Sequence, residues 1–348
     1  MNANKTTHES NRLPPVHIPP LRQCPSEEHA DVVSSSASSV LPELVCGVMG
    51  GMGSEATLDF IHKCLSLTRS LYPATSDAFS DGDHISLVIE LNPKIPNRIS
   101  ALQRGVPEEL AAVSCALRST ASKLSTRQVD FAVAVCNTAH AFESDIVAGL
   151  DGVPFVSIVK LVCSKARDLL AARHGFVDPP LSSISFPSSS SSSSSTPPTS
   201  ASAASIPRLL ILATSGCLSS GLYQSSLSTS LGPLATTSCL PPSLQSRLDS
   251  AVYAAKRGDA KGGAETLLEA GGVAEYLKAE ADAVVLGCTE LPLVFAAVER
   301  MRSWKEGDKA EGNWMEGIIV LDSTAILAEA VVDLCKRRRR LEDVLSGL

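Results

Sequence analysis

Two cysteines, Cys136 and Cys288, end two apolar segments of the same design. VDFAVAVCNTAH covers residues 129–140, and ADAVVLGCTELP repeats the pattern so that the two cysteines are 152 residues apart. An Asp stands six residues before each Cys, at Asp130 and Asp282. A thiol between the end of a strand and the start of a helix has a lowered pKa and can exchange a proton. Two such thiols could act as acid and base on one small substrate.

Either cysteine alone is more typical of a buried structural thiol, so the argument for chemistry depends on the pair. Cys46, Cys64 and Cys163 lie in apolar or helical surroundings and are predicted to be buried, reduced thiols. His140 follows Cys136 by four residues and could either tune the thiol or pack locally. The ten cysteines form no CxxC pair, and no second ligand pair completes a zinc site, so we predict no metal.

The glycine-rich segment GVMGGMGSEAT, at residues 47–57, joins an apolar strand to an amphipathic helix. It lacks the lysine of a P-loop and the spacing of GxGxxG. Two interpretations stay open: a tight strand-to-helix turn, or backbone amides that approach a small anion.

Apolar segments alternate with helical ones, which predicts parallel sheets covered on both faces. The strand, turn and helix at 45–68 have a counterpart at 208–228, and the two Cys segments also correspond. We therefore predict an α/β fold of two similar halves. Ligands of such sheets bind beyond the carboxyl ends of the strands, where both cysteines fall. The strands are expected within 44–51, 84–92, 129–135, 152–159, 208–214, 282–287 and 316–323.

Composition suggests where the domains begin and end. Residues 1–43 are rich in Pro and Ser and are predicted to be a disordered tail. Eight consecutive Ser at 188–195 mark a disordered insertion at about 176–206. The two α/β domains are predicted at 44–154 plus 318–345, and at 155–317.

Charge and hydropathy exclude several classes of partner. Thirty Lys and Arg against thirty-seven Asp and Glu give a net charge of −7, which argues against nucleic acid. No apolar run is long enough for a membrane helix, and the first residues lack a secretory signal, so we expect a cytoplasmic protein. The basic run CKRRRR at 335–340 fits the end of a helix, where cations interact favourably with the dipole.

Six segments together resemble the aspartate/glutamate racemase family of cofactor-independent amino-acid racemases. They span about residues 45–326, with the Ser tract between them. NPKIPNR and GLYQ favour the aspartate racemase branch. The segments are GVMGGMGSEAT, DHISLVIELNPKIPNR, AVCNTAH, LATSGCLSSGLYQ, LGCTELP and VLDST.

The resemblance implies two pseudo-symmetric α/β domains, each a mainly parallel sheet flanked by helices, with the active site in the cleft between them. It implies Cys136 and Cys288 as the catalytic acid/base pair, an amino acid as substrate, no cofactor and a homodimer. Backbone amides after each Cys are suited to a carboxylate that gains enolate character. The expected substrate-binding residues are Met52, Gly53, Asn92, Arg98, Asn137, Thr138, Thr289 and Glu290.

Two departures from the family pattern concern specificity. Asn97 replaces an Asp that is frequent in the family, and Ser225 or Ser226 stands where we expect a lysine. Arg98, the expected partner of a side-chain carboxylate, could also be a surface charge at a helix start. We therefore predict racemisation of aspartate or a related amino acid. The alternatives are a broad-specificity racemase, a catalytically silent amino-acid-binding homologue, and a decarboxylase or isomerase of the same superfamily.

Overall fold

The structure of the protein is a computed structural model, which describes residues 43–73, 79–174, 206–306, 314–336 and 340–347. The predictions for the tail at 1–43 and for the insertion at 176–206 therefore lie almost wholly outside the described residues.

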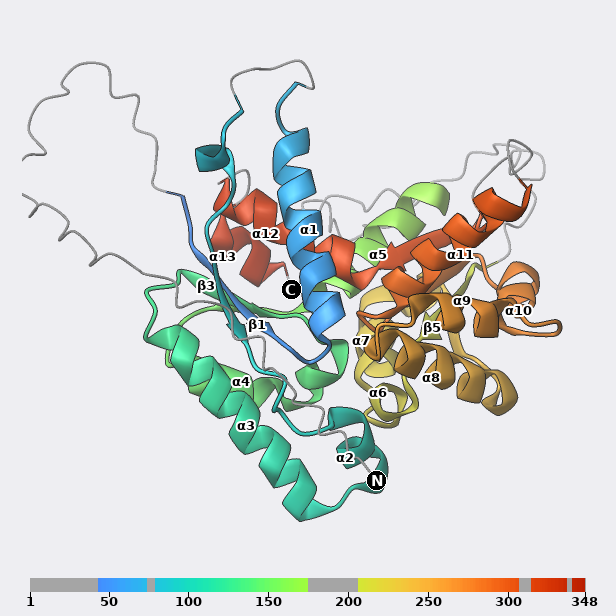
Figure 1. Ribbon diagram of the computed structural model, residues 1–348, viewed down its shortest axis with the longest axis horizontal. Helices are drawn as coiled ribbons and strands as arrows, with labels where there is room; N and C mark the ends of the chain where they lie inside the picture. Colours follow the sequence, from blue (N-terminus) through green and yellow to red (C-terminus); the bar gives the residue numbers. More distant parts are fainter. Residues whose placement is uncertain (1–42, 74–78, 175–205, 307–313, 337–339, 348) are drawn as a thin grey trace, which may run out of the picture. The chain divides into compact units, whose positions relative to one another are not determined.

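Two four-stranded parallel sheets form the framework (Figure 1). The first has the strand order β2-β1-β3-β4 and the second has β6-β5-β7-β8, so the second repeats the first. All neighbouring strands are parallel. The predicted α/β class and the duplication are confirmed. The strands are β1 (Cys46–Gly50), β2 (Leu87–Leu91), β3 (Phe131–Ala134), β4 (Phe155–Val156), β5 (Arg208–Leu212), β6 (Thr236–Cys239), β7 (Ala283–Leu286) and β8 (Ile319–Asp322).

Helices pack on both faces of each sheet. The central strand β1 and, after exposed Arg208, the rest of β5 are buried on both faces, which is why they are apolar without alternation. The helices and 3₁₀-helices are α1 (Ser54–Ser70), η1 (Asp81–Asp83), α2 (Arg98–Arg104), α3 (Pro107–Ser125), η2 (Asn137–Phe142), α4 (Glu143–Leu150), α5 (Ile158–His174), α6 (Ser215–Ser219), α7 (Leu222–Leu231), η3 (Gly232–Leu234), α8 (Pro242–Lys256), α9 (Ala260–Leu268), α10 (Val273–Glu280), α11 (Leu291–Glu306), α12 (Ser323–Cys335) and α13 (Leu341–Ser346).

A shared apolar core joins the two halves. Side chains of β1 and β3 in the first sheet and of β5 and β7 in the second enter one buried cluster with α1, α5, α7 and α12. Two outer cores cover the opposite faces, with α3 and α4 on the first sheet and α8 to α11 on the second. Because the central core contains both sheets, it fixes how the carboxyl ends of β3 and β7 lie relative to each other.

The repeated Asp residues set the register of the strands that carry the cysteines. Asp130 Oδ2 accepts a hydrogen bond from the Val45 backbone N–H at 2.6 Å, and Asp282 Oδ2 accepts one from the Arg208 N–H at 2.8 Å. The backbone N–H of each Asp returns a bond to the carbonyl of the same partner, at 2.9 and 3.0 Å. The two Asp residues therefore have one structural task, repeated in each half.

Two strands lie in a different sheet from the one that our domain boundaries implied. β8 pairs with β7 in the second sheet, although residues 318–345 were assigned to the first domain. β4 pairs with β3 in the first sheet, although the second domain was to begin at residue 155. In each case the strand follows a helical crossover, η2 with α4 before β4 and α11 before β8, which returns the chain to the same sheet. The helix that follows β8, α12, packs against α1 of the first half. β6 was not predicted, because TTSC carries little apolar signal.

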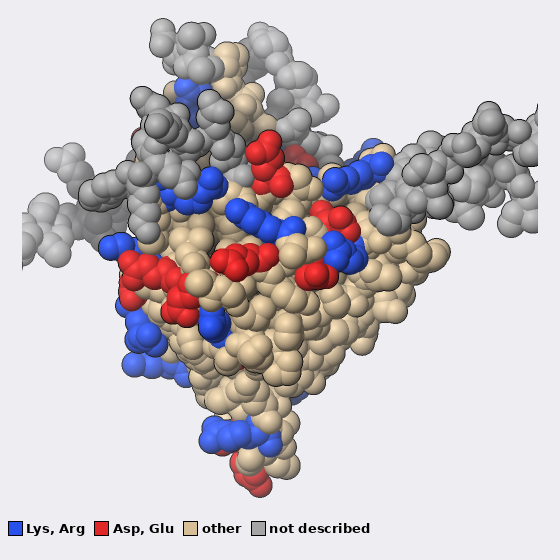
Figure 2. Space-filling view, turned by 90° about the vertical axis from the view of Figure 1, so that its right-hand side faces the viewer, with Lys and Arg blue, Asp and Glu red and all other residues tan. Residues whose placement is uncertain are grey.

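The described surface gives two further observations. No helix in the described ranges is both long and apolar enough to cross a membrane. On the face in Figure 2, basic and acidic side chains are interspersed instead of being separated by sign.

Candidate active site

The two cysteines occupy equivalent places in the two sheets. Cys136 lies between β3 and η2, and Cys288 lies between β7 and α11. Each side chain is 6% exposed. The expected location at the carboxyl ends of parallel strands is thus observed for both thiols.

His140 holds the backbone of Cys136 and does not act on its thiol. His140 Nδ1 lies 2.9 Å from the Cys136 carbonyl oxygen, and Nε2 accepts the Ile158 backbone N–H at 3.3 Å. Because Nε2 accepts, the ring proton is on Nδ1 and the imidazole is neutral. Burial lowers the pKa of His140, which favours the same neutral form. The local packing interpretation of His140 is the one that this geometry supports.

A buried carboxylate connects Cys288 to a cation. The Cys288 thiol donates to Glu290 Oε2 at 3.0 Å, and the Lys256 ammonium forms an ion pair with Glu290 Oε1. The Glu290 side chain is 1% exposed. Burial raises the pKa of the Cys288 thiol well above its ordinary value; the Glu290 carboxylate raises it further, and Lys256 opposes both. Cys288 therefore keeps its proton in the resting site, and Glu290 contacts a thiol and a lysine.

Lys256 is a candidate site residue that the sequence analysis missed. It is the last residue of α8, and Glu290, Cys288 and Cys136 all act on its pKa. Burial alone would lower the pKa of Lys256, but the Glu290 carboxylate and, when they are ionised, the sulfurs of Cys288 and Cys136 outweigh burial and raise it. A negative charge on either cysteine sulfur would therefore be stabilised by the Lys256 ammonium. In the sequence, Lys256 is one of several lysines at a helix end, and nothing local distinguishes it.

A lysine therefore lies near Cys288, but it comes from α8 and not from the segment after GLYQ. Ser225 and Ser226, which stand in its place, line a surface pocket together with Lys160 and Arg167. Proximity in the fold, and not position in the motif, brings this charge to the cluster around Cys288.

The glycine-rich turn brings the first half to Lys256. The Met52 carbonyl oxygen accepts hydrogen bonds from Arg98 Nη2 at 2.7 Å and from Lys256 Nζ at 3.3 Å. At Gly53, a Cβ would collide with Glu290 Oε1. Only glycine at this position leaves room for the pair between Glu290 and Lys256.

Arg98 approaches the same turn from the start of α2. Its Nη1 donates to the carbonyl oxygens of Ile95 and Pro96 at 3.2 and 3.0 Å. Nε is buried and has no hydrogen-bond partner within the described chain. The partners that the structure gives Arg98 are neutral carbonyl oxygens, so its charge can still meet an anion.

Asn97 has a structural role that explains its departure from the family pattern. Its Oδ1 accepts the backbone N–H groups of Ile99 and Ser100 at 3.0 and 3.3 Å, and so caps α2. Asn and Asp are comparably good caps. The replacement therefore preserves the start of the helix that carries Arg98.

Asn92 and Thr289 illustrate how differently the remaining predicted residues are placed. Asn92 Nδ2 donates to Thr120 Oγ1 at 2.9 Å, and its Oδ1 accepts the Lys94 N–H at 3.0 Å, so its carboxamide stabilises the end of β2. The Thr289 hydroxyl donates to Glu290 Oε2 at 3.3 Å. The structure joins Thr289 to the cluster around Cys288, whereas the contacts of Asn92 lie within the first half.

Asn137 and Thr138, which follow Cys136, both contact residues of the second half. The Asn137 carboxamide bonds to Tyr223 and Ser323. The Thr138 hydroxyl bonds to the thiol of Cys217, whose pKa burial raises to about 12. Only the backbone amides of these two residues remain candidates for a substrate carboxylate.

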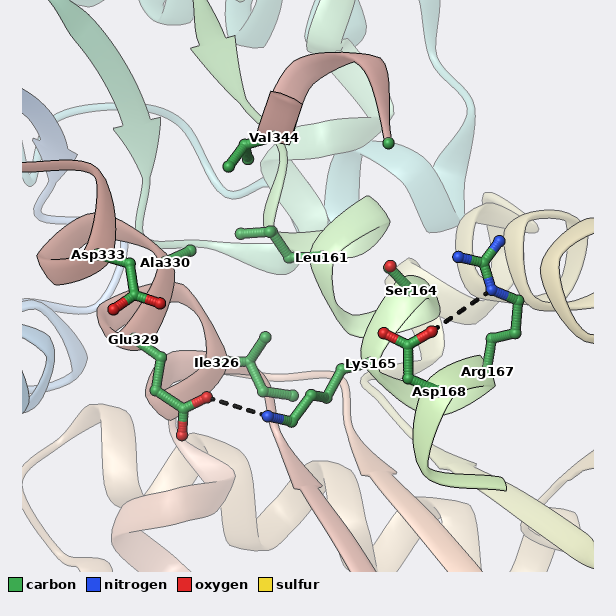
Figure 3. Close-up of a pocket in the computed structure, with 11 residues that line it drawn as sticks. Leu161, Ser164, Lys165, Arg167, Asp168, Ile326, Glu329, Ala330, Asp333 and Val344 are labelled. Carbon is green, nitrogen blue, oxygen red and sulfur yellow. Dashed lines mark hydrogen bonds and ion pairs between the residues drawn. The ribbon is translucent and has the colours of Figure 1, made fainter. Parts of the chain in front are cut away.

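A separate surface pocket lies away from these residues. It has a volume of about 310 Å³ and is bordered by α5, α12 and α13 (Figure 3). Its charges are paired, Lys165 with Glu329 at 3.3 Å and Arg167 with Asp168 at 3.6 Å. None of the predicted site residues lines this pocket. Among the residues that the structure describes, no three His, Cys, Asp or Glu side chains are grouped to hold a metal ion.

Known proteins resemble this arrangement. An aspartate racemase of Picrophilus torridus superposes with a TM-score of 0.57 and 23% identity, covering 88% of this chain and 100% of that one. The fold is that of the aspartate racemases. An aspartate racemase homologue from Pyrococcus horikoshii OT3 gives a TM-score of 0.51 and 19% identity, covering 83% of this chain and 98% of that one. The family resemblance drawn from the motifs is thus confirmed in the fold.

A curated relative is similar in sequence over a shorter stretch. The broad specificity amino-acid racemase RacX of Bacillus subtilis (strain 168) is 31% identical over 114 residues. These are 33% of this chain and 45% of RacX, so the match spans less than half of that relative. No protein-family model matches the chain. The racemase fold accounts for the two parallel sheets of the same strand order.

Proposed function

We propose that this protein is a cofactor-independent amino-acid racemase whose acid/base pair is Cys136 and Cys288. One observation carries the proposal: the two thiols end equivalent strands of two sheets that share one apolar core. Racemisation exchanges mirror-image substrates, and it therefore needs two equivalent proton donors on opposite faces of one carbon. The duplicated strand–Cys unit supplies two such groups.

In the proposed reaction, one cysteine is a thiolate and the other a thiol. The thiolate removes the α-proton from one face, and the electron pair of the broken C–H bond moves into the substrate carboxylate. The thiol on the other face then gives its proton to Cα, so the new C–H bond has the opposite configuration. Each turnover exchanges the roles of the two sulfurs, and the pair should titrate as one coupled unit.

The resting distribution of protons should be asymmetric. Cys288 donates to Glu290, and both burial and this carboxylate raise its pKa. We therefore infer that Cys288 is the resting acid of the pair. When Cys288 must act as the base, Glu290 Oε2 is the acceptor for its proton. Glu290 is thus proposed as a proton relay, and not only as the substrate contact that we expected.

Two sets of groups are proposed to hold an amino-acid substrate. The backbone N–H groups after each Cys, at 137–138 and 289–290, would bind the α-carboxylate as it gains negative charge. Lys256 and Arg98, which both bond the Met52 carbonyl oxygen, would bind a side-chain carboxylate. An interaction with an ionised partner is worth about 1.5–3 kcal/mol. The two cations favour an acidic amino acid, with aspartate first, over the broad specificity that is named for RacX.

The test uses solvent deuterium at Cα and a panel of Asp, Glu, Ala, Ser and homoserine enantiomers. Exchange with interconversion of both aspartate enantiomers supports the racemase, whereas binding without exchange supports the catalytically silent homologue. Cys136→Ala and Cys288→Ala should each abolish interconversion. Full activity of either variant would contradict the two-base assignment. We also propose a cytoplasmic homodimer, which light scattering of the purified protein and fluorescence imaging of a tagged chain would test.

A further inference from the structure

Tyr223 of α7 lies where the two halves of the protein meet. It is fully buried within the shared core. Burial raises the pKa of its hydroxyl well above the ordinary value, so Tyr223 is protonated and can donate. Neither the proton transfers nor the substrate contacts proposed above use this side chain.

A chain of buried hydrogen bonds begins at the Tyr223 hydroxyl. It donates to Asn137 Oδ1 at 2.5 Å, and Asn137 Nδ2 donates to Ser323 Oγ at 3.0 Å. The Ser323 hydroxyl then donates to the Leu286 carbonyl oxygen at 2.7 Å. Asn137 is 2% exposed and Ser323 is fully buried. Each member donates in the same direction along the chain, so each has a partner, and buried networks of this kind favour one arrangement.

This chain connects the two cysteine segments to each other. Asn137 is the residue next to Cys136, and Leu286 ends β7 two residues before Cys288. The Tyr223 ring also touches the second segment directly, because a Cβ added to Gly287 would lie 2.9 Å from Tyr223 Cε2. Tyr223 therefore contacts the immediate neighbour of each cysteine, one with its hydroxyl and the other with the edge of its ring.

We propose that Tyr223 is a positioning residue that sets the spacing of the Cys136 and Cys288 sulfurs through Asn137 and Gly287. This rests on the proposed racemase function and deepens it. Inversion needs both sulfurs in line with one Cα, whereas removal and return of a proton on one face needs only one sulfur. A positioning residue for the pair should therefore affect inversion more than exchange on one face.

Tyr223→Phe tests this with little change of volume. It keeps the ring against Gly287 but leaves Asn137 Oδ1 buried without its donor, which favours rotation of the carboxamide and a shift of the Cys136 segment. In D2O with L-aspartate, one assay follows formation of the D-enantiomer and deuterium in the remaining L-enantiomer. We expect the kcat for inversion to fall roughly tenfold to hundredfold, since a displacement of about 1 Å costs rates of this order. KM and one-face exchange should change much less.

Two further variants complete the design. Ser323→Ala removes the far end of the same chain and should also raise the ratio of exchange to inversion. Tyr276→Phe, on α10 beside the outer core of the second sheet, is the matched control and should leave that ratio unchanged. A merely structural role of Tyr223 would lower the melting temperature and leave the ratio at the wild-type value, which would overturn the proposal.

Crystal structures of wild type and Tyr223→Phe supply a readout that needs no turnover. We expect the distance between the two sulfurs to change by about 0.5 Å or more, the tolerance of a catalytic arrangement. An unchanged distance would overturn the positioning role. If the wild-type protein interconverts no amino acid in the panel, the proposed function fails, and these two structures still decide whether Tyr223 sets the spacing.

Discussion

Replacing Glu290 by Gln would remove the negative charge that helps to keep Cys288 protonated. The substitution is nearly isosteric, so Gly53 still leaves room for the side chain. Glu290 raises the pKa of Cys288 both as a charge and as a hydrogen-bond acceptor, while Lys256 lowers it. Without the carboxylate, the effect of Lys256 is no longer opposed, and the pKa of Cys288 must fall.

The size of this effect follows from the contact itself. A hydrogen bond to a charged group is worth about 1.5–3 kcal/mol, and one pKa unit corresponds to about 1.4 kcal/mol. We therefore expect the pKa of Cys288 to fall by roughly one to two units. Burial remains the largest cause of the raised pKa, so the new value should still lie above that of an exposed thiol.

The assay is the pH dependence of alkylation at Cys288, followed by mass spectrometry of its peptide in the Cys136→Ala background. The alkylation profile of Glu290→Gln should move to lower pH. Glu265→Gln, which removes an exposed carboxylate paired with Lys261 on α9, is the matched control and should leave the profile in place. If the pKa of Cys288 is unchanged or higher in Glu290→Gln, then Glu290 is not the group that keeps Cys288 protonated.

Three other changes have expected outcomes. In steady-state assays, Lys256→Met should raise the KM for aspartate roughly tenfold to hundredfold and should hardly change the KM for alanine. Equal effects on the two substrates would contradict a contact between Lys256 and the side-chain carboxylate of aspartate. Gly53→Ala should lower the free energy of unfolding in urea by about 1–3 kcal/mol, because the new Cβ collides with Glu290; unaltered stability would contradict the close approach. Burial raises the pKa of the Cys217 thiol to about 12, whereas the same thiol in the unfolded chain has a pKa near 8.5. The protonated Cys217 thiol therefore contributes fully to the stability of the fold below about pH 8.5, and this contribution decreases as the pH rises toward 12. Between about pH 8 and 10, the free energy of unfolding should therefore decrease less for Cys217→Ala than for wild type. Equal decreases in both proteins would contradict the raised pKa of Cys217.

The sequence was sufficient to predict the α/β class, the duplication and the position of both cysteines. These features are local: apolar strands of four or five residues, glycine turns, and a thiol where a strand ends. The second cysteine segment also contains Glu290, which the structure places against Cys288. Neighbouring residues at a strand end are necessarily close, so a short motif is a good guide to them.

What the sequence did not reveal depends on contacts between distant segments. Lys256 is 32 residues from Cys288 and is an ordinary helix-end lysine until the fold places it beside Glu290 and Met52. Asn137 was expected at the substrate, but its carboxamide is held by Tyr223 and Ser323 of the other half. β8 was misassigned because apolar strands of the two sheets look alike, and only the pairing with β7 distinguishes them.

The first turnover in D2O tests the two-base claim most directly. Starting from undeuterated L-aspartate, the account predicts that every D-aspartate molecule formed carries deuterium at Cα from the earliest time points. The reason is that the arriving hydrogen comes from the second thiol, which has exchanged with solvent. D-aspartate that keeps the original α-hydrogen would show that one group both removes and returns it, and would contradict the roles given to Cys136 and Cys288.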